Sequence, residues 1–298
     1  MPSLRSAIET RVRELVGVRP GSTLPPAVAD EGDAGLFGPQ AACWKVHGDF
    51  TSIMVGGVAA LLLQMLHPRA LAGVWDHSNF REDRFGRLGR TARFIASTTY
   101  GTTEQALGQI AHVQEIHDRV SGVTADGRSY SANDPDLLTW IHVAEVSSFL
   151  KAYLRHRDPG FSGVDQDRYF AEVATIAERL GARDVPKSRA AVDAYLRAIK
   201  AELRFDGRTR EVAQALLAAP PRGTTGAPFF GLIFRAAEAL LPDWAAQMHG
   251  IHVQTASRPG ISLGVAGLGG VLRWSLRNGA EARARRRTAV SPSAPRTP

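Results

Sequence analysis

The chain has 298 residues, 44% of them apolar, with one cysteine and a formal net charge of +7 at pH 7. A chain of this size can bury a core of ordinary volume, and we expect one domain with appendages. The single cysteine, Cys43, excludes an intramolecular disulfide and a thiolate metal cluster, and a small buried apolar side chain is its expected role. The positive charge is local, because from Arg273 onward there are seven arginines and one acid, Glu281.

Residues 1–40 are expected to hold one short helix and a loop. Residues 4–16 mix charged and apolar side chains and lack the apolar stretch of a signal peptide, so export is not expected. Residues 20–38 are rich in glycine and proline, which indicates a loop. The longest apolar run, residues 53–66, has 14 residues. Spanning a bilayer takes ~20, so this run predicts a buried core helix in a cytoplasmic protein.

Helices are predicted for most of the remaining chain, because apolar residues recur at spacings of three and four and few stretches alternate as strands do. The expected fold class is therefore all-α. The predicted helices are residues 4–16, 51–66, 87–98, 103–120, 135–155, 166–180, 187–204, 209–217, 227–240, 243–255 and 263–277.

Several helix boundaries carry local signals. Thr102 or Thr103 can cap the helix that contains His117, Pro135 stands in the first turn of its helix, and Gly181 follows a helix end. Pro68, directly after His67, is interpreted as a helix stop.

The most informative stretch joins a cluster of Arg87, Arg90 and Thr91 to His117, 26 residues after Thr91. Arg87 and Thr91 are four residues apart and share a helix face. Arginines one turn apart can hold an anionic group, such as a haem propionate, and a neutral imidazole can bind a metal. This combination suggests a buried cofactor site.

His117 is predicted to face the apolar side of its helix, with Ile110 and Val113, whereas His112 lies about 140° around the helix. Iron and a backbone carbonyl could satisfy its two ring nitrogens, and the alternative is a histidine that hydrogen-bonds across the core. His142 lies on a second stripe with Glu145. It could line a distal pocket, donate a hydrogen bond behind a ligand or belong to the core, and the core interpretation is favoured.

Other common sites are excluded by their missing motifs. The sequence has no Glu-x-x-His for a di-iron site, no His-Glu-x-x-His for zinc, no Gly-x-Gly-x-x-Gly, no P-loop and no Gly-x-Ser-x-Gly. It also lacks Cys-x-x-Cys-His, so any haem would be b-type.

Further motifs surround the cluster, and in their order and spacing the set resembles the catalytic domain of the MpaB-type oxygenases and the bacterial rubber oxygenases (latex clearing proteins). The additional motifs lie at residues 44–49, 56–68, 73–74, 77–78 and 134–144. The resemblance implies a globin-like helical core that holds haem b, with a catalytic domain over residues 41–278. By the same resemblance, His117 matches the proximal iron ligand, and Arg87 and Thr91 match residues on the distal side of the haem.

Two departures from that family pattern stand out. Arg90 occupies a position where some rubber oxygenases have a lysine over the iron, and because arginine stays protonated it cannot act as a sixth ligand. In the stretch where rubber oxygenases carry a distal glutamate, here residues 68–74, there is no acid, although Asp76, Glu82 and Asp83 lie nearby. Cleavage of polyisoprene is therefore not the expectation.

The leading hypothesis is a haem b-dependent oxygenase that uses O2 on an apolar, unsaturated substrate of isoprenoid or lipid type. His117 would bind the iron, Arg87 and Thr91 would act on the distal side, and Arg90 and His142 would be further cofactor contacts. The alternative is a cofactor-free helical carrier of an apolar ligand. Residues 279–298 are predicted to be a disordered basic tail that can contact an anionic membrane, without interleaved aromatics that would indicate nucleic-acid binding.

Overall fold

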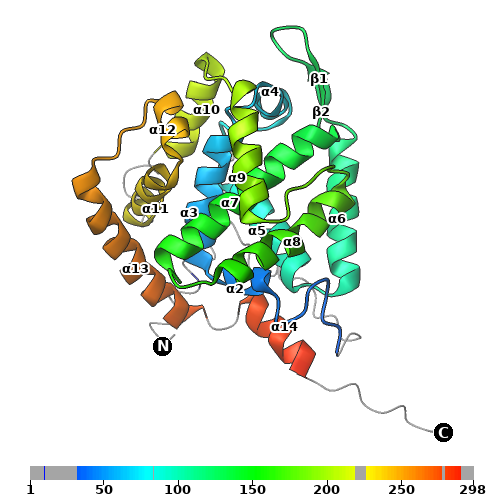
Figure 1. The fold of residues 1–298 in the computed structure, drawn as a ribbon, viewed down its shortest axis with the longest axis vertical. Coiled ribbons are helices and arrows are strands. Elements are labelled where there is room, and N and C mark those ends of the chain that lie inside the picture. Colours follow the sequence, from blue (N-terminus) through cyan, green and yellow to red (C-terminus); the bar gives the residue numbers. More distant parts are fainter. Residues whose placement is uncertain (1–9, 11–31, 83, 219–225, 277–278, 290–298) are drawn as a thin grey trace, which may run out of the picture.

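The structure, a computed structural model, describes residues 10, 32–82, 84–218, 226–276 and 279–289, except for the side chains of Arg84, Phe85 and Arg87. In this part the chain forms a helical bundle with one short two-stranded hairpin, so the all-α prediction is confirmed (Figure 1). The globin-like arrangement stays a prediction. The elements are α2 (Ala42–Gly48), α3 (Phe50–Gln64), α4 (Pro68–His77), α5 (Arg84–Tyr100), α6 (Thr103–His117), β1 (Ser121–Val123), β2 (Ser129–Ser131), α7 (Pro135–His156), α8 (Gly163–Leu180), α9 (Arg189–Ala198), η1 (Ile199–Ala201), α10 (Gly207–Leu217), α11 (Ala227–Leu240), α12 (Asp243–His249), η2 (Thr255–Ser257), α13 (Arg258–Ser275) and α14 (Ala280–Ala289).

Helices α3 and α7 form the centre of the bundle. α3 is apolar almost throughout and buries most of its side chains, and it packs closely against α7. Figure 1 shows α3 and α7 in the middle, with α11 and α13 on one side and α5, α6 and α8 on the other. The core predicted at residues 53–66 is therefore confirmed as a buried helix.

Buried apolar side chains form two main clusters that meet along α7. Trp140 belongs to the cluster built with α3 and α11, and Phe149 belongs to the cluster built with α2 and α8. Cys43 is buried in the second cluster, as expected for a small apolar side chain. α7 thus contributes side chains to both halves of the core.

Three predicted helix boundaries are confirmed by their geometry. Thr102 caps α6 in a capping box with Gln105, and Pro135 stands at the start of α7, whose N-cap Asp134 accepts hydrogen bonds from two backbone amides. Gly181 ends α8 with φ of 107°, a left-handed conformation that glycine adopts without strain.

The prediction of a helix stop at His67-Pro68 is only half right. α3 ends at Gln64, but Pro68 also begins the new helix α4, with His67 as its N-cap. Proline suits the first helical position because the amide proton it lacks would have no partner there.

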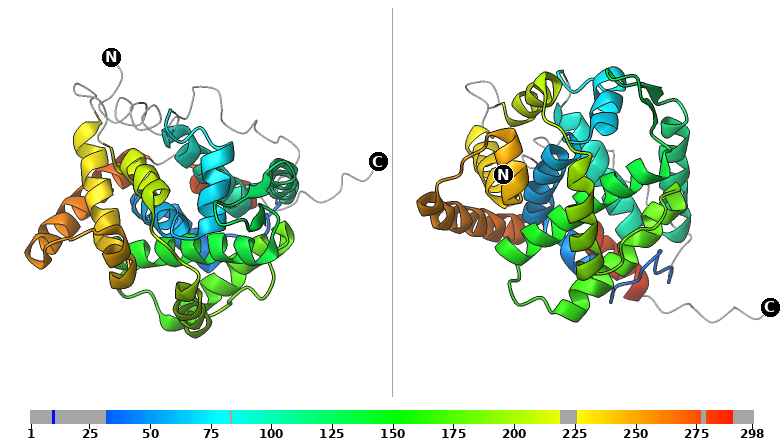
Figure 2. Two further views of the ribbon diagram at one scale, coloured as in Figure 1. Left: turned by 90° about the horizontal axis from the view of Figure 1, so that it is seen from above. Right: turned by 45° about the horizontal axis from the view of Figure 1, so that its top comes forward.

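The helix that contains His117 is shorter than predicted. α6 ends at His117 rather than at residue 120, and the backbone amide of Val120 then bonds to the carbonyl oxygen of His117. The chain turns at this point into β1, which pairs antiparallel with β2. Figure 1 shows this hairpin projecting beyond the helices at the top of the view, and Figure 2 shows the helices from two further sides. His117 therefore lies at a helix end instead of in a helix interior.

The predicted disorder of residues 279–298 does not hold for Ala280–Ala289, which form α14. Ala284 is buried, and the Arg287 guanidinium donates to the carbonyl oxygens of Asp33, Tyr100 and Gly101. Carbonyls at the C-terminal end of a helix such as α5 lack intrahelical donors, so an arginine stabilises them. Residues 290–298 lie outside the described part of the chain.

The predicted helix at residues 4–16 and most of the predicted N-terminal loop also lie outside the described residues. Among the helices that are described, none alone has the length and apolarity to cross a bilayer. α2 and α3 together meet those two criteria, and the chain bends by 88° between them.

Candidate functional site

Helices α5 and α6 form a hairpin that has the arginine cluster and His117 at the same end. α5 ends at Tyr100 and α6 begins at Thr103, so the two helices run in opposite directions and contact one another (Figure 1). The first turns of α5, which contain Arg87 and Thr91, therefore lie at the same end of the hairpin as the last turn of α6.

His117 has a half-buried imidazole at the end of α6. Its Nδ1 atom is buried and has no hydrogen-bond partner in the described part of the chain. Burial lowers the pKa of His117, while Asp118 and Asn133 act in the opposite direction. The ring is therefore neutral near pH 7, which is the form that binds a metal ion.

His112 confirms the predicted orientation of the same helix. Its side chain is 59% exposed and lies 3.8 Å from the carboxylate of Glu115. His112 and His117 thus face different environments, as the helical spacing predicts.

The arginine cluster is described only in part. Thr91 is half-buried and Arg90 is exposed on α5, while the side chain of Arg87 lies outside the described atoms. The roles of these three residues stay predictions, and the structure adds that they occupy one end of the α5–α6 hairpin.

A second group of titratable side chains lies deep in the bundle on α7. Burial lowers the pKa of His142 to about 4 and raises the pKa of Glu145 to about 7. His142 Nε2 has no hydrogen-bond partner among the described residues. Both side chains have an intermediate accessible surface, so neither is fully enclosed by protein.

His47 on α2 is the neighbour of this group. Its Nδ1 atom lies 2.8 Å from Thr99 Oγ1 and its Nε2 atom lies 3.1 Å from the Tyr169 hydroxyl. Burial lowers the pKa of His47 to about 3, with a further contribution from His142. Helices α2 and α7 thus place two neutral histidines and one carboxyl group in the interior, and α5 and α8 provide the partners of His47. Such a combination of perturbed groups is typical of functional sites.

The sequence alone missed part of this arrangement. His47 has no sequence signal that assigns it a role, and nothing in the spacing connects it with Thr99 or Tyr169. Glu145 was recognisable only as a member of the stripe that contains His142. A glutamate on a helix face that is otherwise apolar is the signal that could have marked it.

The buried carboxyl of Glu145 makes folding stability depend on pH. Its pKa rises from 4.5 to about 7 on folding, so the folded state binds more protons between these values and stability falls as the pH rises through them. The loss above pH 7 is about 3 kcal/mol, at about 1.4 kcal/mol for each pKa unit. Glu145→Gln should remove it, so that the variant gains up to about 3 kcal/mol relative to the parent between pH 5 and pH 8.

Urea unfolding at both pH values measures this difference. Glu104→Gln, at an exposed position on α6, is the control and should follow the parent. A Glu145→Gln protein whose stability relative to the parent is the same at pH 5 and pH 8 would contradict the shifted pKa.

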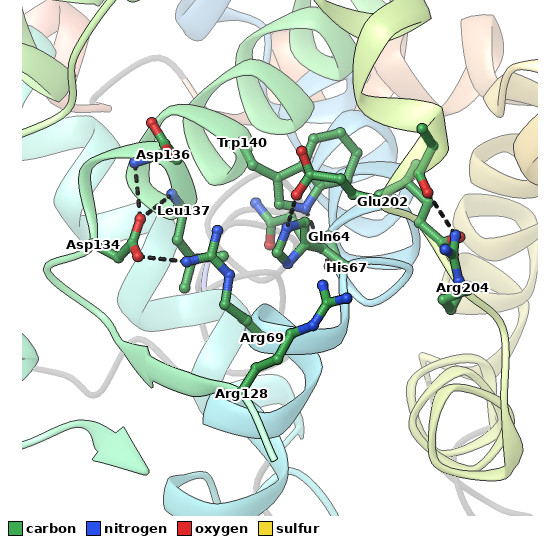
Figure 3. Close-up of polar contacts among 12 residues, drawn as sticks. Gln64, His67, Arg69, Arg128, Asp134, Asp136, Leu137, Trp140, Glu202 and Arg204 are labelled. Carbon is green, nitrogen blue, oxygen red and sulfur yellow. Dashed lines mark hydrogen bonds and ion pairs between the residues drawn. The ribbon is translucent and has the colours of Figure 1, made fainter. Parts of the chain in front are cut away.

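Figure 3 shows a further polar cluster where α3, α4 and α7 meet. The His67 ring lies 3.6 Å from the Glu202 carboxylate, and Arg69 donates to Asp134 at 2.5 Å (Figure 3). Asp134 also caps α7, so Arg69 joins the start of α4 to the start of α7. We interpret this cluster as structural.

No group of three or more histidine, cysteine, aspartate or glutamate side chains that could hold a metal ion occurs in the described part of the chain. A haem iron needs only one protein ligand, so this finding does not test His117.

Comparison with models of known protein families identifies a relationship. A family model described as "ER-bound oxygenase mpaB/B'/Rubber oxygenase, catalytic domain" matches residues 44–274. No curated protein and no solved structure matches the chain.

Proposed function

The chain belongs to the family formed by the catalytic domains of the ER-bound oxygenases mpaB/B' and the rubber oxygenases, and from this premise we propose that it is a haem b-dependent oxygenase of an apolar, unsaturated substrate. Oxygenase activity in general follows from the family. The cofactor, the substrate class and the residue roles are the proposal.

His117 is the observation that carries the proposal. It combines a buried ring nitrogen without a partner, a pKa lowered by burial and a place at the same end of the α5–α6 hairpin as Arg87 and Thr91. In the proposal, His117 would hold the haem iron, and Arg87 and Thr91 would lie near the same cofactor.

Haem b, when bound, supplies an iron at which O2 reacts. In this chain His117 would hold the iron, and the nearby arginines Arg87 and Arg90 would bind propionates or stabilise negative charge that develops on oxygen. Thr91 would donate a hydrogen bond on the distal side. His142, neutral and deep, would contact the apolar edge of the cofactor or the substrate.

Proton transfer is assigned to Glu145 in this proposal. Two acidic side chains that lie closer in sequence to the arginine cluster already have hydrogen-bond partners. Asp76 accepts a hydrogen bond from the Tyr130 hydroxyl at 2.7 Å, and Glu82 accepts one from Asn79 at 2.8 Å. Asp76 and Glu82 are also exposed, whereas Glu145 is deep and its pKa of about 7 suits a group that accepts and returns a proton near neutral pH.

Peripheral contact with an anionic membrane through residues 279–298 stays a proposal, as does a cytoplasmic location. Two arginines of this segment are already engaged in the fold, since Arg285 pairs with Glu281 and Arg287 binds backbone carbonyls.

The deciding experiment is the ultraviolet-visible spectrum of the protein expressed with 5-aminolevulinate. A Soret band that shifts on reduction and on binding of carbon monoxide supports the proposal. A colourless protein that co-purifies with lipid would instead support the alternative, a cofactor-free carrier of an apolar ligand.

Arg87→Ala is expected to lower turnover by about 100-fold while haem content is retained, because a charged donor on the distal side acts in the reaction more than in cofactor binding. Oxygen consumption with squalene, an unsaturated isoprenoid, is the measurement. Arg93→Ala, at an exposed position on the same helix, is the matched control. Full turnover of the Arg87 variant would remove this residue from the mechanism.

A further inference from the structure

We propose that the chain has a second ligand site, for a single-chain amphiphile with an anionic head group, on the face of α7 that points away from the interior histidines. A pocket of about 450 Å³ opens there between α7, α8, α9, η1 and the segment that joins α11 to α12. Small-molecule sites usually measure roughly 300–1,000 Å³.

The wall of this pocket is mainly aliphatic and aromatic. α3 and α7 contribute its inner side, and α8, α9 and the end of α11 contribute the rest. The apolar lining includes Leu63, Leu154, Phe170, Val192, Leu196 and Leu240. Burying an alkyl or isoprenoid chain against such a wall is favourable by about 0.8 kcal/mol for each methylene group.

Cationic side chains line the same pocket. Lys151, Arg197 and Lys200 are among the lining residues, and Asp193 is the one acid among them. None of the three cations has a hydrogen bond or an ion pair with a described residue, and the Lys200 ammonium lies 5.3 Å from the centre of the Trp244 ring. The pocket therefore has an excess of positive charge.

A fourth cation in the lining is already engaged. Arg189 donates to both carboxylate oxygens of Asp167, at 3.1 and 3.2 Å. Because Arg189 is paired with Asp167, the cations that can bind an anionic head group are Lys151, Arg197 and Lys200.

Lys151 gives the site its polarity. Burial lowers the pKa of this lysine, and Arg155 lowers it further, while Asp243 acts in the opposite direction. Lys151 still has an exposed side chain, as do Arg197 and Lys200. A carboxylate or phosphate that enters the pocket can therefore accept charge-assisted hydrogen bonds from them. An apolar chain with one anionic end matches both parts of the pocket.

The pocket is separate from the interior site. Lys151 follows His142 by nine residues, which is two and a half turns, so the two side chains project from opposite faces of α7. The lining has no histidine or cysteine, so the pocket does not suit a metal or haem iron. The inference therefore stands whether or not the proposed oxygenase function holds.

In the first experiment, a dansyl-labelled undecanoic acid is bound to the full chain and displaced by four unlabelled compounds. Each of the four has a twelve-carbon chain, and they differ in the head group. Dodecanoate and dodecyl phosphate should both compete with the probe. Their relative affinities show whether the site prefers a carboxylate or a phosphate head group. Dodecanol should bind at least about tenfold more weakly, the ratio that corresponds to losing one hydrogen bond to a charged group. Dodecyltrimethylammonium should not compete.

Quenching of Trp244 locates the ligand. A brominated dodecanoate should quench tryptophan fluorescence of the parent, and Trp244→Phe should remove that quenching, because Trp244 is the tryptophan that lines the pocket. Quenching that persists in the Trp244→Phe protein would place the ligand elsewhere and overturn the proposal.

Charge reversal tests the head-group contact. Lys200→Glu and the double variant Lys151→Glu, Lys200→Glu should weaken dodecanoate binding by at least about tenfold. Arg179→Glu, at an exposed position on α8 outside the pocket, should bind as the parent does. If circular dichroism shows that the double variant is unfolded, the affinity of Lys200→Glu alone decides. Equal affinity for dodecanol and dodecanoate, or unchanged affinity in Lys200→Glu, would overturn the assignment.

Discussion

Replacing His117 with alanine is expected to lower the affinity for haem b by at least about a hundredfold, since even residues that only support a metal ligand contribute factors of 10 to 100. The buried Nδ1 atom without a partner and the neutral ring are the reasons to assign the iron to this side chain. Titration of the purified apoprotein with haemin, followed by the Soret band, measures the loss without requiring a substrate.

His112→Ala is the matched control for that titration. It removes the same ring from the same helix, five residues earlier, at an exposed position. We expect it to bind haem as the parent does. A His117→Ala protein that keeps an unchanged Soret band would end the assignment of His117 and direct attention to His142 and His47.

Gly56→Ala is expected to destabilise the fold by at least about 2 kcal/mol, because the added methyl group meets backbone that cannot move independently. Its Cβ would lie 2.9 Å from the Phe149 Cα atom and from the Ser148 carbonyl oxygen. α3 and α7 would have to separate, and these two helices carry both halves of the core.

The adjacent glycine provides the control. At Gly57 an added Cβ would lie 3.8 Å from the nearest atom, Phe149 Cε1, which is ordinary contact. Gly57→Ala should therefore be stabilising by about 0.5–1 kcal/mol through helix propensity. Unfolding by urea should separate the two variants by about 3 kcal/mol. Equal stability of the two would show that α3 and α7 do not approach as closely as described.

Helix positions were predictable wherever apolar spacing and local caps agree. α11 spans the predicted residues, and α6 begins at the predicted cap. The different environments of His112 and His117 also follow from helical spacing, because 100° per residue fixes which side chains share a face. By contrast, α4 and α14 were missed, since a proline after a helix and a run of arginines both favour other interpretations when read locally.

The sequence by itself determined the all-α class and the family resemblance, because these depend on periodicity and on motifs within short stretches. The grouping of Arg87, Thr91 and His117 into one site stays a prediction from the same motifs. Only the tertiary structure decided that Glu145 is buried, that His47 bonds to Thr99 and Tyr169, and that Lys151 lines a second pocket. The physical reason is that desolvation and hydrogen bonding between distant helices depend on how the helices pack. Packing of that kind is set by close approaches such as that of Gly56 to Phe149, which connect residues far apart along the chain.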